Sequence, residues 1–224
     1  QFYDDGTPTG GIYETSTAAQ RNSGDHGTKC AGVIGARPDP SKSADPNYMV
    51  GMAPGCSILP LYVKGYVKSL VASAINYAAV TRSADVISIS DSEVGLDGND
   101  PVGNALDSAF ANGTLICAAT MNEDKNEIHY PASRVSVMAC GASNAVNDRC
   151  SMIDWGPGKG SNYGSSMSVV ALGVDIKTTG LSGYELFEGT SASTPQVAAL
   201  AAILISTFPT LKHRPQSTRA IIEQ

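Results

Sequence analysis

The chain has 224 residues, 42% hydrophobic and 16% charged, a composition typical of a globular protein with one large core. Its net charge of −6 and the absence of a basic cluster in the sequence exclude nucleic acid as the main partner. The longest apolar run, Val197–Ile205, is shorter than the about 20 residues that cross a bilayer, so we expect no membrane span. We expect one domain over residues 1–224.

Strand patterns and helix patterns alternate along the first two thirds of the chain. The Asn112-Gly113 pair predicts the end of one helix. Continuous apolar strands that alternate with helices predict an α/β domain, doubly wound, whose mostly parallel central sheet has helices on both faces. The predicted strands are 57–63, 85–90, 114–119, 135–139 and 168–172, and the helices between them are 67–82 and 102–110.

The last third contains a long helix at 191–208 that is hydrophobic nearly all round, which predicts a central, buried position. A short closing helix is expected at 216–223, and a helix rich in small residues at 26–36. Loops at the carboxyl ends of the strands are the expected place for a site.

Three polar residues stand at positions where chemistry is expected, and each also has a plain structural interpretation. Ser191 begins the buried helix, where it would act as a nucleophile or as a helix cap. His26 begins a small-residue helix, as a general base or as a surface residue. Asn122 follows a strand, as an oxyanion donor or as a turn residue. His129 and His213 are interpreted as ordinary polar residues.

Five cysteines allow at most two internal disulfides, and the sequence leaves their pairing open. The sequence contains no Cys-x-x-Cys pair, which argues against a structural zinc site.

Two motifs resemble those of the subtilisin-like serine protease family, the subtilases. The first is His26-Gly-Thr followed by Cys-Ala-Gly, and the second is Gly189-Thr-Ser-Ala-Ser-Thr-Pro195. Asn122 lies between them in the chain, in the order that the family has. The resemblance extends from Gly24 to Gln224. Lys29-Cys30 and Ala192-Ser193 are weakly similar to the kexin-like branch. Further segments that resemble the family, in the expected order, are 51–55, 84–90, 130–132, 161–164 and 173–176.

The resemblance implies a serine endopeptidase that hydrolyses peptide bonds of peptide or protein substrates through an acyl-enzyme. It implies that Ser191 is the nucleophile, His26 the general base and acid, and Asn122 the oxyanion-hole donor. It also implies secretion or a place in the secretory-pathway lumen, and structural calcium, with no cofactor needed for catalysis. The acidic loops 97–100 and 123–127 lack a recognisable calcium-ligand spacing, so we assign no metal residues.

The family's catalytic triad consists of a serine, a histidine and an aspartate, and the aspartate lies on an apolar strand before the histidine. The chain departs from the family at this aspartate. This N-terminal strand is not identifiable here, because Asp4 and Asp5 lack an apolar run, and Asp25 is predicted to cap the helix that follows it. A segment elsewhere or a separate chain would then supply the aspartate strand, which is the alternative we favour. Otherwise the chain is a catalytically impaired subtilisin-like pseudoprotease domain that acts as a binding or structural module.

Two substitutions fall at the expected substrate cleft. Met121 stands where the family usually has glycine, and Ser90-Asp91-Ser92 replaces the family's Ser-Leu/Trp-Gly edge that pairs with the substrate. We therefore expect weak or unusual peptidase activity, or none. A serine esterase on another α/β fold is disfavoured, because Ser191 is not in a Gly-x-Ser-x-Gly context and the histidine precedes it.

Overall fold

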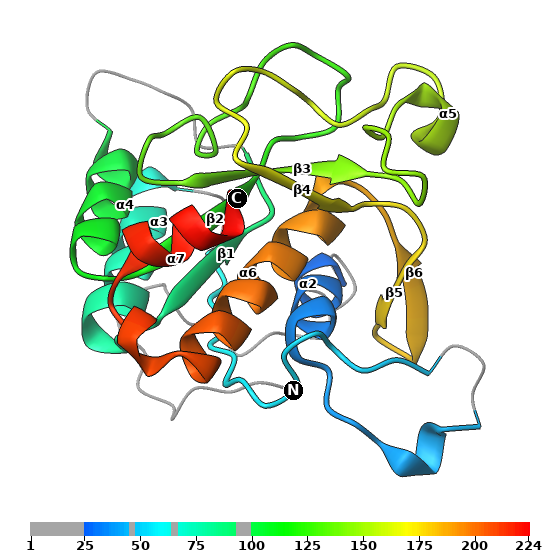
Figure 1. The fold of residues 1–224 in the computed structure, drawn as a ribbon, viewed down its shortest axis with the longest axis horizontal. Coiled ribbons are helices and arrows are strands. Elements are labelled where there is room, and N and C mark those ends of the chain that lie inside the picture. Colours follow the sequence, from blue (N-terminus) through cyan, green and yellow to red (C-terminus); the bar gives the residue numbers. More distant parts are fainter. Residues whose placement is uncertain (1–24, 45–47, 64–66, 93–99) are drawn as a thin grey trace.

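A parallel sheet of four strands forms the centre of the computed structural model, which describes residues 25–44, 48–63, 67–92 and 100–224 (Figure 1). The order of the strands in the sheet is the same as their order in the chain. In all three neighbouring pairs the strands run parallel, as the continuous apolar runs predict. The strands are β1 (Val86–Ile89), β2 (Leu115–Ala119), β3 (Met138–Ser143) and β4 (Val169–Leu172).

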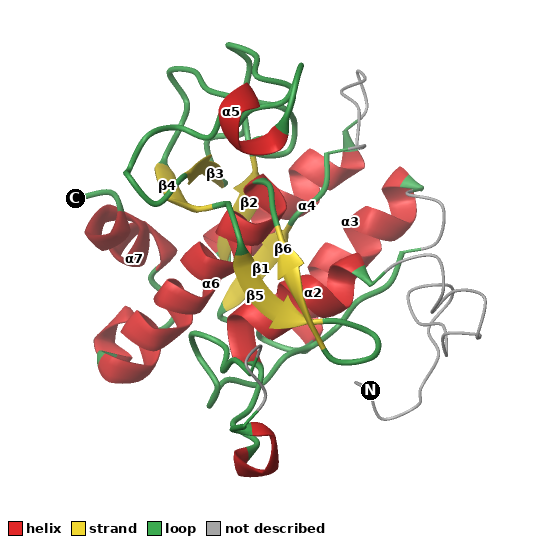
Figure 2. Cartoon of the chain, turned by 90° about the vertical axis from the view of Figure 1, so that its right-hand side faces the viewer, coloured by secondary structure: helices red, strands yellow, loops and turns green. Residues whose placement is uncertain are grey.

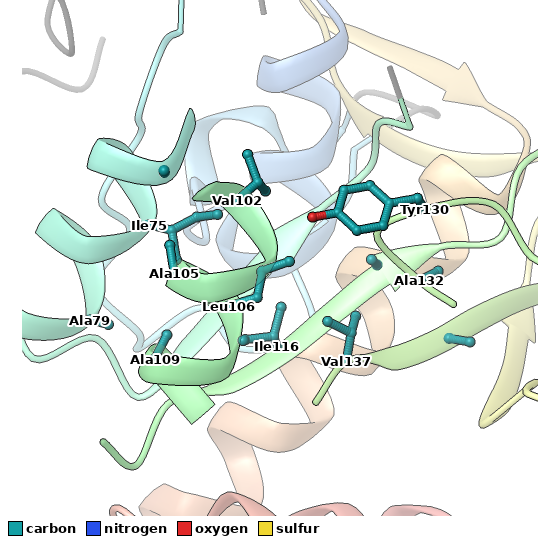
Figure 3. Packing of buried hydrophobic residues seen from close by; sticks show 13 residues of the cluster. Ile75, Ala79, Val102, Ala105, Leu106, Ala109, Ile116, Tyr130, Ala132 and Val137 are labelled. Carbon is teal, nitrogen blue, oxygen red and sulfur yellow. The ribbon is translucent and has the colours of Figure 1, made fainter. Parts of the chain in front are cut away.

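Helices cover both faces of this sheet, as the sequence predicts (Figures 1 and 2). On one face, α3 (Lys68–Asn76) and α4 (Pro101–Ala111) pack together and enclose a cluster that includes Ile116 and Leu106 (Figure 3). The opposite face carries α6 (Thr190–Thr207), which buries Leu115 and Cys117. Alternate residues of β2 thus enter different cores, which explains why this strand has no polar side.

The remaining elements lie around these layers. Helix α2 (His26–Gly35) packs against α6 and against β5 of a small antiparallel pair. The long helix α6 has ten buried residues, in agreement with its predicted central position. The other elements are β5 (Ile176–Thr179), β6 (Tyr184–Phe187), α5 (Met152–Trp155), α7 (Pro215–Ile222), the π-helical turn η3 (Tyr77–Thr81), and the 3-10 turns η1 (Pro40–Lys42) and η4 (Pro209–Leu211).

One predicted strand is wrong. Residues 57–63 form no strand, although the run is apolar. A strand needs a neighbour for its backbone groups, and among the described residues 57–63 pair with no strand. The edge of β1 that faces away from β2 also has no strand beside it in this part of the chain. Strand β3 also starts three residues later than predicted, at Met138, because 132–137 form turns in which Val135 is 92% exposed.

The structure answers the question of the cysteines, which the sequence left open. All five are free thiols, and Cys117, Cys140 and Cys150 are buried. Within the described ranges, no helix is long and apolar enough to cross a membrane.

Candidate functional site

Ser191 lies in the first turn of α6 rather than at its cap. The helix begins at Thr190 and its N-cap is Gly189, which has a φ of 101° that glycine adopts easily. The interpretation of Ser191 as a helix cap is therefore wrong. Backbone N–H groups of a first turn have no acceptor within the helix, so the N–H of Ser191 is suited to hold an anion.

Ser90, at the end of β1, contacts Ser191 through hydrogen bonds in both directions. The Oγ of Ser191 donates to the carbonyl oxygen of Ser90 at 3.4 Å, and the Oγ of Ser90 donates to the carbonyl oxygen of Ser191 at 3.2 Å. The structure thus brings the predicted substrate edge to the predicted nucleophile. The hydroxyl of Ser191 is oriented by Ser90 in this state.

Asn122, which follows β2, is held against the start of α6. Its Oδ1 accepts hydrogen bonds from the backbone N–H of Thr190 at 2.9 Å and from the Oγ1 of Thr190 at 3.0 Å. Because the oxygen of the amide is engaged by the residue directly before Ser191, the NH₂ group of the amide is the end left to bind a ligand oxygen. The two donors expected for an oxyanion therefore belong to adjoining segments.

His26 is the first residue of α2, and its exposed ring contacts Phe187 edge-on, with ring centroids 5.4 Å apart. The Nδ1 of His26 lies 3.8 Å from the Sγ of Cys30, one turn along the helix. Loss of water around part of the ring lowers the pKa of His26, and this effect outweighs the nearby charge of Asp91, which raises it. The imidazole is therefore neutral at neutral pH, as a general base requires.

The described residues contain no hydrogen bond between His26 and Ser191, and none between His26 and a carboxylate. Asp25 stands at the N-cap position of α2, as predicted, but its side chain accepts no capping hydrogen bond. Its carboxylate is paired with Lys29 at 2.8 Å instead, because one turn of helix brings the ammonium group beside it. Asp4 and Asp5 lie outside the described residues.

The other predicted substrate-binding residues, Asp91, Ser92 and Met121, follow the ends of β1 and β2. The carboxylate of Asp91 accepts a hydrogen bond from the backbone N–H of Ser92 at 2.7 Å. Met121 has a φ of 81°, the left-handed conformation that favours glycine, and its N–H donates to the Oγ1 of Thr190 at 3.2 Å. The backbone at Met121 thus has the shape expected of a glycine, although a larger residue occupies it.

No group of three or more His, Cys, Asp or Glu side chains within the described ranges could hold a metal ion. Residues 97–99 of one acidic loop are outside these ranges, and the loop 123–127 has carboxylates near His129 but no such group. Structural calcium therefore stays a prediction, and we derive no chemical step from a metal.

Two residues of the site were missed by the sequence analysis. Thr190 orients the amide of Asn122, and the buried Asn162 binds the backbone on both sides of Asn122. Both belong to segments that resemble the subtilases, and that resemblance was the only signal available. Their contacts join parts of the chain that are 68 and 39 residues apart, which no local pattern records.

Comparison with known proteins gives consistent matches. The family model described as the subtilase family matches residues 8–224. Subtilisin DY of Bacillus licheniformis is 32% identical over 195 residues, which cover 83% of this chain and 65% of that protein. Subtilisin of Bacillus pumilus is 31% identical over 205 residues, which cover 88% of this chain and 68% of that protein.

Solved structures show the same fold. The self-cleaved protease domain of PatA is 26% identical with a TM-score of 0.72, covering 95% of this chain and 77% of that one. Sphericase is 24% identical with a TM-score of 0.72, covering 89% of this chain and 68% of that one, and supports the fold alone. The chain spans only part of the curated relatives, 65% of subtilisin DY and 49% of subtilisin E of Bacillus subtilis strain 168.

Proposed function

This chain belongs to the subtilase family, and we propose that it is a serine endopeptidase that hydrolyses peptide bonds through an acyl-enzyme on Ser191. The observation that carries the proposal is the contact between Asn122 and Thr190 at 2.9 and 3.0 Å, which fixes an amide donor beside the nucleophile. We propose one domain over residues 1–224 that acts on an extended peptide or protein segment.

In the proposed reaction, the Nε2 of neutral His26 takes the hydroxyl proton of Ser191 while the Oγ attacks the carbonyl carbon of the peptide bond. The amide of Asn122 and the N–H of Ser191 stabilise the negative oxygen of the tetrahedral intermediate. The protonated His26 then gives its proton to the leaving amine. Water attacks the acyl-enzyme in the same way and regenerates Ser191.

We further propose that the carboxylate that orients His26 comes from a strand outside the described residues, in this chain or a separate one. The edge of β1 supports this proposal, because all four of its residues are only half-buried and the described residues place no strand there. The Oγ of Ser88 in β1 and the Oδ1 of Asp85, directly before β1, are buried without a hydrogen-bond partner among the described residues. An added strand would satisfy an open edge.

Labelling with a fluorophosphonate probe tests the proposed function. We expect labelling of the unmodified chain that is lost in Ser191→Ala and in His26→Ala, and that is kept in the matched controls Ser206→Ala and His129→Ala. Absence of labelling in folded protein would refute the proposal. If the chain is labelled, turnover of a mixed peptide library by the unmodified chain and by Met121→Gly shows whether Met121 restricts the substrates that are cleaved.

The second candidate is a pseudoprotease domain that binds another chain. The hydrogen bond of Ser191 to Ser90, rather than to His26, favours this alternative. Retention of a peptide ligand by both the unmodified chain and Ser191→Ala, with no cleavage by either, would support it. Secretion, or a place in the secretory-pathway lumen, remains a proposal that rests on the subtilase resemblance.

A further inference from the structure

We infer that Asn162 is a positioning residue for the oxyanion donor Asn122, and this inference rests on the proposed function. Asn162 is 0% exposed and lies in the segment that runs beside the loop after β2. A buried amide has four hydrogen-bonding positions to satisfy, and burial without partners is costly. The side chain of Asn162 fills three of them with Glu123 and Lys125, which follow Asn122.

The side-chain oxygen of Asn162 binds the loop directly after Asn122. Its Oδ1 accepts hydrogen bonds from the backbone N–H groups of Glu123 at 3.0 Å and Lys125 at 3.1 Å. Its Nδ2 donates to the Oε2 of Glu123 at 2.9 Å. The two backbone N–H groups can donate only to the oxygen of the amide, so their positions determine which way the amide is turned.

The backbone of Asn162 binds the residues directly before Asn122. Its N–H donates to the carbonyl oxygen of Met121 at 2.9 Å, and its carbonyl oxygen accepts from the Oγ1 of Thr120 at 3.3 Å. The carbonyl oxygen of Asn122 itself accepts from the N–H of Gly160 at 3.2 Å. Asn122 is thus the centre of a loop whose backbone is held from both sides.

The support for Asn162 reaches the central sheet. The Oγ of Ser161 donates to the carbonyl oxygen of Asn162 at 3.2 Å and accepts from the N–H of Ala142 in β3 at 2.9 Å. The left-handed backbone at Met121 is held by the same residue, since its carbonyl oxygen is the one that Asn162 binds. Substitution of the Asn162 side chain removes two hydrogen bonds to backbone N–H groups of the loop that follows the oxyanion donor, whereas the backbone contact with Met121 stays.

Kinetics of Asn162→Ala, Asn122→Ala and the double variant test the inference. Because a misplacement of about 1 Å in a site can cost about 100-fold, we expect kcat to fall about 10- to 100-fold in Asn162→Ala, with KM changed less than about threefold. In the Asn122→Ala background the same change should lower kcat less than about twofold, because the group it positions is gone. An equal loss of kcat in both backgrounds would overturn the inference.

A conservative pair of variants guards against a general loss of folding. Asn162→Asp keeps the oxygen that accepts the two N–H groups but faces the Glu123 carboxylate with a like charge, so kcat should fall. Adding Glu123→Gln restores a donor across this contact, and we expect kcat within about threefold of the unmodified chain. No rescue in a double variant that melts at the temperature of the unmodified chain would overturn the inference.

The position of the amide is also measurable without activity. In a proton–nitrogen spectrum, the NH₂ signals of Asn122 are identified by their absence in Asn122→Ala. We expect them to move in Asn162→Ala and to stay in Thr218→Val, which removes a buried hydroxyl hydrogen bond of 3.2 Å in α7. Unmoved signals in Asn162→Ala would overturn the inference, whereas an inactive unmodified chain would refute only the proposed function.

Discussion

Replacing Thr190 by valine removes one hydroxyl from the middle of the site without changing the shape of the side chain. Thr190 is completely buried, and valine keeps its branched form in the helix. The Oγ1 of Thr190 donates to Asn122 at 3.0 Å and accepts from the N–H of Met121 at 3.2 Å. The substitution therefore leaves Asn122 with one donor to its oxygen and Met121 with an unpaired N–H.

The size of the effect follows from these two contacts. Loss of one hydrogen bond costs about 1 kcal/mol and an unpaired N–H adds about 1–3 kcal/mol, so the free energy of unfolding should fall by about 2–4 kcal/mol. The amide of Asn122 would keep a single bond, to the N–H of Thr190, and would be free to rotate about it. We expect kcat to fall by less than the about 100- to 1,000-fold that complete loss of an oxyanion donor costs.

Two measurements check this prediction. Chemical denaturation gives the free energy of unfolding of Thr190→Val, and the rate of fluorophosphonate labelling reports the site. Thr190→Ser is the matched control, because it keeps the hydroxyl and should retain most of the labelling rate. Equal stability and equal labelling rates for Thr190→Val and the unmodified chain would refute the assignment of these hydrogen bonds.

Three further predictions concern other residues of the candidate site. Asp91→Asn removes a negative charge that raises the pKa of His26, so the acid side of the profile of kcat/KM against pH should move to lower pH. A move to higher pH would contradict this effect of Asp91 on His26. Burial raises the pKa of the Cys30 thiol to about 11, so mass spectrometry should show slow alkylation by iodoacetamide at pH 7.5, and fast alkylation would refute its burial. Met121 has a φ of 81°, a conformation that costs a non-glycine residue about 1–2 kcal/mol, so Met121→Gly should show little loss of stability in thermal unfolding. A peptide library should show that this variant cleaves a wider set of substrates than the unmodified chain. An unchanged set would contradict the predicted narrowing of the cleft.

The sequence predicts the sheet and its helices well because each has a strong local pattern. The apolar runs of β1 and β2 and the nearly unbroken apolar surface of α6 leave few alternatives. The strand predicted at 57–63 fails for a non-local reason, since a strand forms only where a neighbour exists. Local propensity carries no information about the open edge of β1.

The candidate site was predicted in part. The structure brings Ser191, Asn122 and Ser90 together, and it shows the charge of Asp91 acting on His26. The roles of Thr190 and Asn162 depend on contacts with backbone atoms, and such contacts leave no pattern of residue types in the sequence.

The hydrogen bonds between Asn122 and Thr190 join the nucleophile and its oxyanion donors into one unit, which does not include the base. This unit is formed by the end of β2 and the start of α6. The base belongs to another, α2, whose first residue is His26. The two are in direct contact, because the Sγ of Cys30 in α2 lies 3.7 Å from the carbonyl oxygen of Ser191, so a displacement of α2 would slow proton transfer and also reach the start of α6.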